Sequence, residues 1–298
     1  MFSLKSFTPF FFYLLAATGG AQTVVNDTFS DNERLTDSAP NSLRWTSGAH
    51  HSTAASAFTS LDASGGQLFW DHTTGGNNSF SGIWGHFIAG ASPLTLLVGE
   101  TMTLGFDVTF SGGLFSTSPN GFRWALFDSN NSRITTDFAG TNATGISSGT
   151  TFSGWRGYVA QLAANSSEVA GSTFLTRERV LSGNGLFVSA EYADIAGSSV
   201  DEPTISAATP YHATLTLERT VGGMIVQGSF NGVSTIAGTD ATPVTEFDTI
   251  SFFTLDVLTQ DITLDNISLT VTPEPTCAAL LSLSGIVWLG ARRKGHSI

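Results

Sequence analysis

Two aspartates, Asp27 and Asp265, lie in alternating apolar segments near the two ends of the central part of the chain. Side chains two residues apart share one face of a β-strand, so Asp27 should share the apolar face of Val25 and Phe29. Burying a carboxylate is costly unless it has a partner. A structural Ca²⁺, which prefers oxygen ligands, would satisfy both carboxylates together with backbone carbonyls.

The segment around Asp265 is irregular. Its apolar residues change parity, in the order Ile262, Leu264, Ile267 and Leu269. An extra residue in a strand has this effect, so we predict a β-bulge at Asp265-Asn266. Two interpretations follow. In one, both aspartates bind Ca²⁺. In the other, the bulge turns Asp265 outward and Asp27 caps a turn.

A second kind of chemistry is carbohydrate binding, which uses flat aromatic rings for the faces of sugars and planar polar groups for their hydroxyls. The candidate ligand-binding residues are Trp70, Trp84, Arg123 and Asp128. Alternation along a strand places Arg123 and Trp124 on opposite faces, so these two cannot act together. The alternative is that the tryptophans belong to the core, the commoner position for so large a side chain.

Catalytic patterns are poorly represented, and we assign no catalytic residue. The sequence has no Gly-x-Ser-x-Gly motif and no pair of glutamates flanking an aspartate at alternate positions. Glu191 and Asp194 come nearest, but a spacing of three puts them on opposite faces of a strand. Glycoside hydrolysis needs two carboxyls about 5–9 Å apart. These could come from distant strands, so a hydrolase or lyase stays an alternative.

The C-terminal segment combines three features in a fixed order. They are the triplet Pro273, Glu274 and Pro275, the uncharged apolar run from Cys277 to Ala291, and the basic cluster Arg292, Arg293 and Lys294. The prolines should end the preceding strand, since proline cannot donate to a sheet and restricts the residue before it. A basic cluster after an apolar helix holds that end on the cytoplasmic side of a membrane.

This arrangement resembles the PEP-CTERM sorting signal of Gram-negative bacteria. The resemblance implies processing by an exosortase and a role in the cell envelope or the extracellular matrix, alongside extracellular polysaccharide. It also implies a precursor anchored in the inner membrane through a hydrophobic helix within residues 273–298. The apolar run has 15 residues, whereas a membrane-spanning helix needs about 20. The alternative is a buried helix of the fold.

The N-terminus resembles a secretory signal peptide. Lys5 provides the positive region, the run from Phe7 to Ala17 provides the apolar region, and Gly19 and Ala21 suit the −3 and −1 positions of a cleavage site. We therefore expect signal peptidase to cleave after Ala21, following export by the secretion machinery. The expected organisation is a signal peptide over residues 1–21, a body over residues 22–272 and a sorting signal over residues 273–298.

The composition of the body excludes some functions. Between Gln22 and Thr272 there are 23 acidic residues, 8 arginines and no lysine, which gives a net charge of −15. This argues against nucleic-acid binding, which needs a basic surface. The chain has a single cysteine, Cys277, outside the body, so an exported body must be stabilised by its core without a disulfide.

Period-two alternation dominates the body. Leu104, Phe106, Val108 and Phe110 alternate with polar residues, as expected for an antiparallel sheet with one solvated face. An Asn231-Gly232 pair between β-prone residues predicts a hairpin. We expect further strands at Val24–Phe29, Gln67–His72, Ile83–Ile88, Phe122–Asp128, Arg156–Leu162, Leu186–Tyr192, Tyr211–Leu217, Met224–Phe230, Phe247–Leu255 and Ile262–Val271. Many short strands without helical periodicity predict an all-β fold: one two-sheet antiparallel sandwich of the jelly-roll type.

Two stretches of the body, Asn26–Asp31 and Leu264–Leu269, resemble the ends of concanavalin-like and laminin-G-like jelly rolls. The resemblance implies that the first and last strands are neighbours, and that an Asp near the end of the chain serves a structural Ca²⁺. We therefore expect an exported, non-catalytic, carbohydrate-binding-like sandwich. The alternatives are a polysaccharide hydrolase or lyase on the same fold and a structural or adhesive spacer.

Overall fold

The computed structural model describes residues 20–51, 60–71, 80–88, 92–111, 121–141, 152–162, 173–180, 186, 191–195, 200–201, 205–255 and 261–273. Residues Ala21–Thr272 form one compact unit. The expected signal peptide, apart from its last two residues, and the sorting signal after Pro273 lie outside the described residues. Within the described ranges, no helix is long and apolar enough to cross a membrane.

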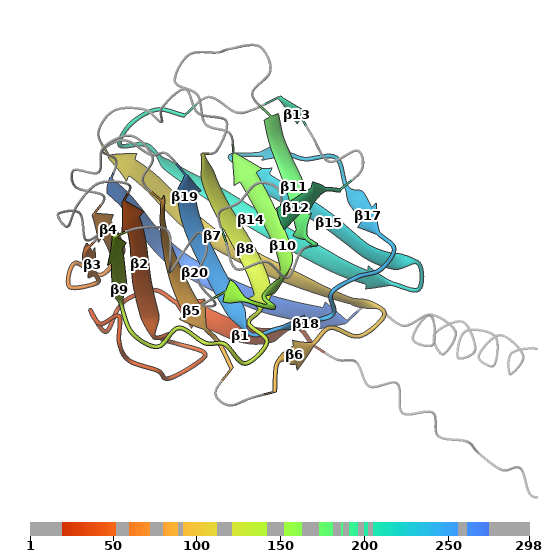
Figure 1. The fold of residues 1–298 in the computed structure, drawn as a ribbon, viewed down its shortest axis with the longest axis horizontal. Helices are drawn as coiled ribbons and strands as arrows, with labels where there is room; N and C mark the ends of the chain where they lie inside the picture. Colours follow the sequence, from red (N-terminus) through yellow and green to blue (C-terminus); the bar gives the residue numbers. More distant parts are fainter. Residues whose placement is uncertain are drawn as a thin grey trace, which may run out of the picture. The chain divides into compact units, whose positions relative to one another are not determined.

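Two large β-sheets make up this unit (Figure 1). Sheet 1 contains β1 (Gln22–Asp27), β3 (Ser60–Asp62), β4 (Leu68–Asp71), β7 (Glu100–Ser111), β14 (Pro210–Thr220), β15 (Gly223–Phe230), β16 (Val233–Ser234), β17 (Gly238–Asp240) and β20 (Asp261–Pro273). Its order is β16-β15-β14-β7-β20-β4-β3, with β1 also paired to β20 and β17 to β15.

Sheet 2 contains β2 (Trp45–His51), β5 (Phe80–His86), β8 (Phe122–Asp128), β9 (Phe138–Thr141), β10 (Arg156–Leu162), β11 (Thr173–Arg179), β12 (Tyr192–Asp194), β13 (Val200–Asp201) and β19 (Thr249–Leu255). Its order is β12-β11-β10-β8-β19-β5-β2-β9, with β13 paired to β11. A small third sheet joins β6 (Leu94–Thr95) and β18 (Glu246–Phe247).

Neighbouring strands in both sheets run antiparallel, as in β1–β20, β7–β14 and β8–β19, whereas β2 and β9 form a parallel pair. The all-β, two-sheet prediction is therefore confirmed, with one parallel edge that alternation alone does not reveal. Most of the strand expected at Leu186–Tyr192, residues 187–190, lies outside the described residues. Leu186 and Glu191 are not in a strand, and Tyr192 is the first residue of β12. The longest strands that the sequence analysis missed are β2 and β11, because Gly and His in the first and three charged residues in the second hide any alternation. Several strands of two to four residues were missed as well, such as β3, β6 and β9.

The main core lies between the two sheets. Sheet 1 contributes Leu104, Leu215 and Leu269, and sheet 2 contributes Trp124 and Phe252 to the same buried cluster. The alternating residues of β7 and β14 point inward as expected, because each strand buries every second side chain. This core contains no disulfide, so apolar burial supplies most of the stability.

Sheet 2 departs from the expectation of one solvated face, because it is buried on both sides. A second cluster that includes Trp84, Phe127, Phe152, Trp155 and Phe253 covers its outer face. Along a strand of sheet 2, alternate residues belong to the main core and to this second cluster in turn. Loops fold over this face and exclude water, a tertiary effect that strand periodicity cannot report.

The first and last strands are neighbours, as the jelly-roll resemblance implies. In β1 and β20, Gln22 pairs with Val271 and Asp27 with Ile267 (Figure 1). The predicted bulge is confirmed: buried positions in β20 switch parity after Leu264, and Asn266 has a φ of 50°. The strand ends at Pro273, as the proline predicts. The Asn231-Gly232 hairpin is also present, between β15 and β16.

Candidate functional site

Asp27 points into the protein and is fully buried. Its Oδ1 accepts a hydrogen bond from the backbone N–H of Phe29 at 3.0 Å. Its Oδ2 accepts from the backbone N–H of Leu43 at 3.0 Å and from Nε1–H of Trp45 at 2.9 Å. Burial raises the pKa of this carboxyl, and the three hydrogen bonds oppose that rise. The carboxylate therefore closes a turn at the end of β1 and holds the segment that leads into β2.

Asp265 occupies a different environment. It lies at the bulge in β20 on the solvated side of sheet 1, where it accepts from Nε2 of Gln67 at 3.1 Å and from the backbone N–H of Asn266 at 2.7 Å. The structure thus separates the two aspartates: one is inside and the other is half-buried at the surface. This arrangement matches the second interpretation, with Asp265 turned outward and Asp27 capping a turn.

These residues do not fit a shared Ca²⁺ site. Both oxygens of Asp27 face N–H donors, which would lie where a cation would bind, since a cation repels the positive end of an N–H dipole. Among the described residues, no group of three or more His, Cys, Asp or Glu side chains could hold a metal ion. The bulge signal in the sequence was correct, but Asp27 is satisfied by hydrogen bonds from Phe29, Leu43 and Trp45.

Trp70 and Trp84 are both fully buried, the first in the main core and the second in the outer cluster on sheet 2. Neither ring can receive a sugar face, so the structure overturns their assignment as ligand-binding residues. The other tryptophans of the body, Trp45, Trp124 and Trp155, are buried as well. Side chains of this size add a large apolar contact area to the core of a sandwich.

Arg123 is also fully buried and cannot contact a surface ligand, contrary to its assignment. Its guanidinium lies 5.3 Å from the ring centroid of Tyr192 and 5.5 Å from that of Phe253. Its three nitrogens have no hydrogen-bond partner in the described part of the chain. Burial lowers the pKa of Arg123 to about 10. The expectation that Arg123 and Trp124 face opposite ways is confirmed, since Trp124 lies in the main core.

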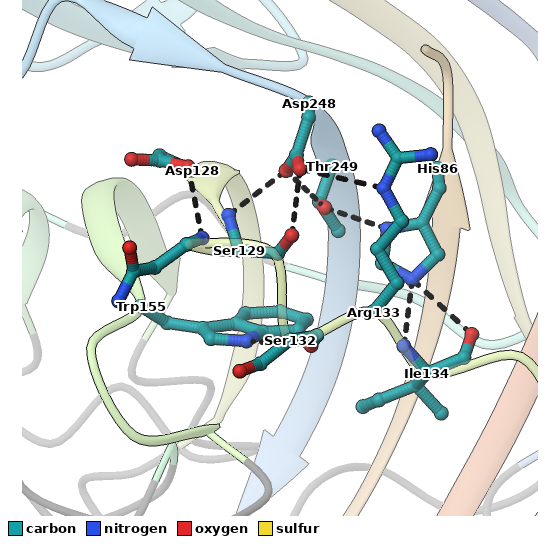
Figure 2. Close-up of polar contacts among 10 residues, drawn as sticks. His86, Asp128, Ser129, Ser132, Arg133, Ile134, Trp155, Asp248 and Thr249 are labelled. Atoms are coloured by element: carbon teal, nitrogen blue, oxygen red, sulfur yellow. Dashed lines mark hydrogen bonds and ion pairs between the residues drawn. The ribbon is translucent and has the colours of Figure 1, made fainter. Parts of the chain in front are cut away.

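Asp128, the fourth candidate, is half-buried at the end of β8 and lies beside a buried polar network (Figure 2). Its Oδ1 accepts from the backbone N–H of Asn130 at 2.9 Å, an Asx turn that starts the following loop. Burial is the main cause that raises the pKa of Asp128. The structure therefore gives this side chain a turn-forming role and leaves its part in ligand binding untested.

The centre of the network is Asp248, which lies between β18 and β19. It accepts from the backbone N–H of Ser129 at 2.9 Å, from Oγ of Ser129 at 2.6 Å and from Oγ1 of Thr249 at 2.6 Å (Figure 2). Nε of Arg133 lies 3.7 Å away and provides a positive charge. Each partner belongs to the loop after β8 or to β19, so one carboxylate ties these elements together.

His86, at the end of β5, completes the network. Its Nδ1 lies 2.7 Å from Oγ1 of Thr249. Since that hydroxyl gives its only proton to Asp248, Nδ1 must carry a proton and donate to Thr249. Nε2 then accepts from the backbone N–H of Ile134 at 3.0 Å. Burial, the main cause, lowers the pKa of His86 to about 4, so the ring is neutral at pH 7.

Serine, histidine and aspartate thus meet without forming a catalytic triad. The Ser129 hydroxyl donates to Asp248 and not to the histidine, and both ring nitrogens of His86 are engaged. A general base also needs a pKa near the working pH, which His86 lacks. The network holds the loop after β8 against sheet 2, and its chemistry is structural.

A different polar cluster lies on the solvated face of sheet 1, formed by Asp107 on β7, His212 on β14 and Asn266 on β20. Asp107 and His212 are directly opposite in register. Nδ1 of His212 lies 2.8 Å from one oxygen of Asp107, and Nδ2 of Asn266 donates to the other at 2.8 Å. The His212 side chain is 64% exposed and that of Asp107 is 38% exposed. We call these three residues the sheet-face cluster.

The surroundings of the sheet-face cluster leave it open. A Cβ at Gly105 would come within 3.1 Å of Oγ of Ser268 and 4.0 Å of Nε2 of His212, so glycine keeps the backbone bare at this point. Phe69, 38% exposed, projects from β4 on the same face and pairs with Thr263, three residues before Asn266. Apolar and polar groups therefore share one accessible surface.

The sequence indicated which way the side chains of the sheet-face cluster point, but not that they lie together. Alternation put Asp107 and His212 on polar faces of their strands, but nothing in the sequence made β7, β14 and β20 adjacent. The bulge predicted at Asp265-Asn266 was the one local signal, because it turns Asn266 outward.

Glu178 is a further carboxyl in an unusual environment. Burial, followed by the nearby Asp240, raises the pKa of Glu178 on β11 to about 7. Asp240 in turn accepts from the hydroxyl of Tyr158 at 2.6 Å and from the backbone N–H of Thr242 at 2.8 Å. A carboxyl that stays protonated near neutral pH is the form that the general acid of a glycosidase takes.

No family model matches the sequence, and no curated protein matches it significantly. Solved structures with a similar arrangement include the metal-free Emp46p carbohydrate recognition domain, at 12% identity, 85% of this chain, 96% of that chain and a TM-score of 0.49. The VIP36 exoplasmic/lumenal domain in its Ca²⁺/Man3GlcNAc-bound form matches at 11% identity, covering 84% of this chain and 87% of that chain, with a TM-score of 0.44. A Bacillus subtilis protein of unknown function with a galectin-like fold matches at 13% identity, covering 76% of this chain and 88% of that chain, with a TM-score of 0.44. At this level the similarity assigns neither a ligand nor a site to this chain.

Proposed function

We propose that this protein is a non-catalytic carbohydrate-binding protein whose ligand lies on the solvated face of sheet 1. The observation that carries the proposal is the sheet-face cluster, in which His212 and Asn266 hold an accessible carboxylate from both sides. Such fixed positions reduce the conformational entropy lost on binding. The ligand is an extracellular polysaccharide.

The chemistry of the cluster suits sugar hydroxyls, which both donate and accept hydrogen bonds. Asp107 offers acceptor lone pairs, Asn266 offers an amide oxygen and a second N–H, and His212 offers Nε2. Phe69 lies on the same face, where its ring can pack against the C–H groups of a sugar. The strongly acidic body, with a net charge of −15 over residues 22–272, favours a neutral glycan over an anionic one.

A glycan array with the Gln22–Thr272 fragment, followed by titration of the best glycan, tests this proposal. We expect Asp107→Ala to weaken binding about 10- to 100-fold, since hydrogen bonds to a charged group contribute roughly 1.5–3 kcal/mol. The matched control is Asp62→Ala. Asp62 is exposed on β3 of the same sheet, and its carboxylate accepts hydrogen bonds from the N–H and the hydroxyl of Ser64 in its own turn.

Several outcomes would contradict the proposal. Equal affinities of Asp107→Ala and Asp62→Ala would place the ligand elsewhere on the body. Failure of the wild type to bind any glycan would favour the structural or adhesive spacer. Release of reducing ends from a bound polysaccharide, abolished by Glu178→Gln, would instead support a hydrolase that uses the raised pKa of Glu178.

The proposed setting is the envelope or extracellular matrix of a Gram-negative bacterium. Export through the signal peptide would give a precursor held in the inner membrane by the run from Cys277 to Ala291, which an exosortase then processes. The end of β20 at Pro273 supports this order, because the triplet that begins with Pro273 follows the fold directly. The tail would then be a sorting signal and not an element of the sandwich.

Removal of the tail is a separate expectation. Mass spectrometry of the mature protein from its native host should show a C-terminus near the Pro273–Pro275 triplet. Glu274→Ala should leave an unprocessed precursor in the membrane fraction, whereas Glu246→Ala, which removes an exposed acid within the body, should be processed normally. A wild-type protein that still ends at Ile298 would refute the sorting part of the proposal.

A further inference from the structure

Three exposed apolar side chains gather at one end of sheet 1, and we call them the apolar tip. Leu97 is 60% exposed, Val98 57% and Val221 96%. The first two lie in the turn before β7, and the third lies in the turn between β14 and β15. The backbone N–H of Gly99 donates to the carbonyl of Arg219 at 2.7 Å, so the two turns are adjacent.

Turns normally carry Gly, Pro, Asn, Asp or Ser. The turn at the other end of β15 follows this rule with Asn231 and Gly232. Both turns of the apolar tip contain a glycine, Gly99 in one and Gly222 in the other, but each also exposes large apolar side chains. The two turns are adjacent and come from distant parts of the sequence. Exposed apolar residues that gather in this way mark a surface that contacts a partner or a membrane.

Both ends of the body emerge beside the apolar tip. At the C-terminal end, Oγ1 of Thr272 donates to the carbonyl of Thr101, at the start of β7, at 3.4 Å. At the N-terminal end, Gln22 pairs with Val271. The chain therefore enters and leaves the sandwich at the end of sheet 1 that carries the exposed apolar side chains.

The sequence beyond these points is apolar on both sides. The run from Cys277 to Ala291 begins four residues after Pro273, a distance of about 14 Å when fully extended. As a helix, its 15 residues would extend about 22 Å, against a hydrocarbon thickness of about 30 Å. A short segment with a short connection keeps the body close to the bilayer surface.

We propose that the apolar tip is a membrane-contact surface that packs into the lipid interface while the precursor is anchored. This inference rests on the anchored precursor of the proposed function. The partner is lipid, and the attraction is apolar. Glu100 and Arg219 beside the tip have opposite charges, and the acidic body would be repelled by anionic headgroups. Interfacial apolar groups enter the headgroup boundary by about 5–10 Å.

The test uses the full chain reconstituted in phosphatidylcholine–phosphatidylglycerol vesicles. In a Cys277→Ser background, Val98→Cys is labelled with an environment-sensitive nitrobenzoxadiazole dye. The matched control is Ile236→Cys, which is 56% exposed in the wild type against 57% for Val98. Ile236 follows Thr235, whose backbone N–H donates to the carbonyl of Gly228. Gly228 pairs with Leu215 in the middle of sheet 1. We expect a blue shift of emission and quenching by nitroxide lipids at position 98 and neither at 236.

The outcomes separate the two proposals. If the full chain does not float with the vesicles, the anchored precursor fails and the tip proposal with it. If the chain floats but the labels at 98 and 236 behave alike, anchoring stands and the tip proposal is overturned. A label at Val221→Cys, in the second turn, provides an independent position and must give the same blue shift as position 98.

Discussion

Asp27→Ala is expected to lower the free energy of unfolding by about 3–5 kcal/mol, because it leaves three buried donors without an acceptor. The donors are the backbone N–H groups of Phe29 and Leu43 and Nε1–H of Trp45. Each orphaned buried donor costs about 1–3 kcal/mol. Urea unfolding of the Gln22–Thr272 fragment, followed by tryptophan fluorescence, measures the loss.

The controls for this prediction also decide between the two interpretations of the aspartates. Asp265→Ala removes a half-buried carboxylate at the surface and should cost less than about 1 kcal/mol. A chelator should leave the melting temperature of the wild type unchanged if hydrogen bonds alone satisfy Asp27. A melting temperature that rises with free Ca²⁺, and no longer does so in Asp265→Ala, would restore the metal interpretation.

Acidification from pH 6.5 to pH 4 should destabilise the fold through His86 by about 3 kcal/mol, at 1.36 kcal/mol per pKa unit. Burial lowers the pKa of His86 from 6.5 to about 4 in the folded state. Between these values the unfolded chain binds a proton that the folded chain does not, so unfolding becomes more favourable as the pH falls. The added proton would sit on Nε2, which lies 3.1 Å from the carbonyl of Ile134, but the cost of burying the charged ring outweighs this contact.

Urea unfolding at a series of pH values measures this effect. His86→Gln should be less stable at pH 7, since the network loses a member, but its stability should fall less steeply between pH 6.5 and pH 4. Identical slopes for wild type and His86→Gln would show that other groups cause the acid sensitivity.

Local patterns determined much of the fold in advance. Period-two alternation set the buried and solvated residues of β7 and β14, and the parity switch located the bulge at Asp265-Asn266. The Asn231-Gly232 pair located a hairpin, and Pro273 marked the end of β20. These features depend on neighbouring residues along one strand, and the sequence displays such neighbours directly.

The partners of the functional side chains depended on tertiary structure. Asp107 meets His212, 105 residues away, and Asn266, 159 residues away. Trp84 was a candidate for sugar binding, but it is buried within the second cluster, on the outer face of sheet 2. Asp27 looked like half of a metal site but finds donors 16 and 18 residues further along the chain.

The physical reason is the range of the interactions. The face to which a side chain belongs follows from backbone geometry over two residues, so the sequence by itself determined which residues could be buried. Strand order, the loops that cover a sheet and the hydrogen bonds between strands follow from contacts between distant segments. The tertiary structure therefore decided which buried carboxylate is satisfied, which tryptophan is hidden and which outward residues lie together on sheet 1.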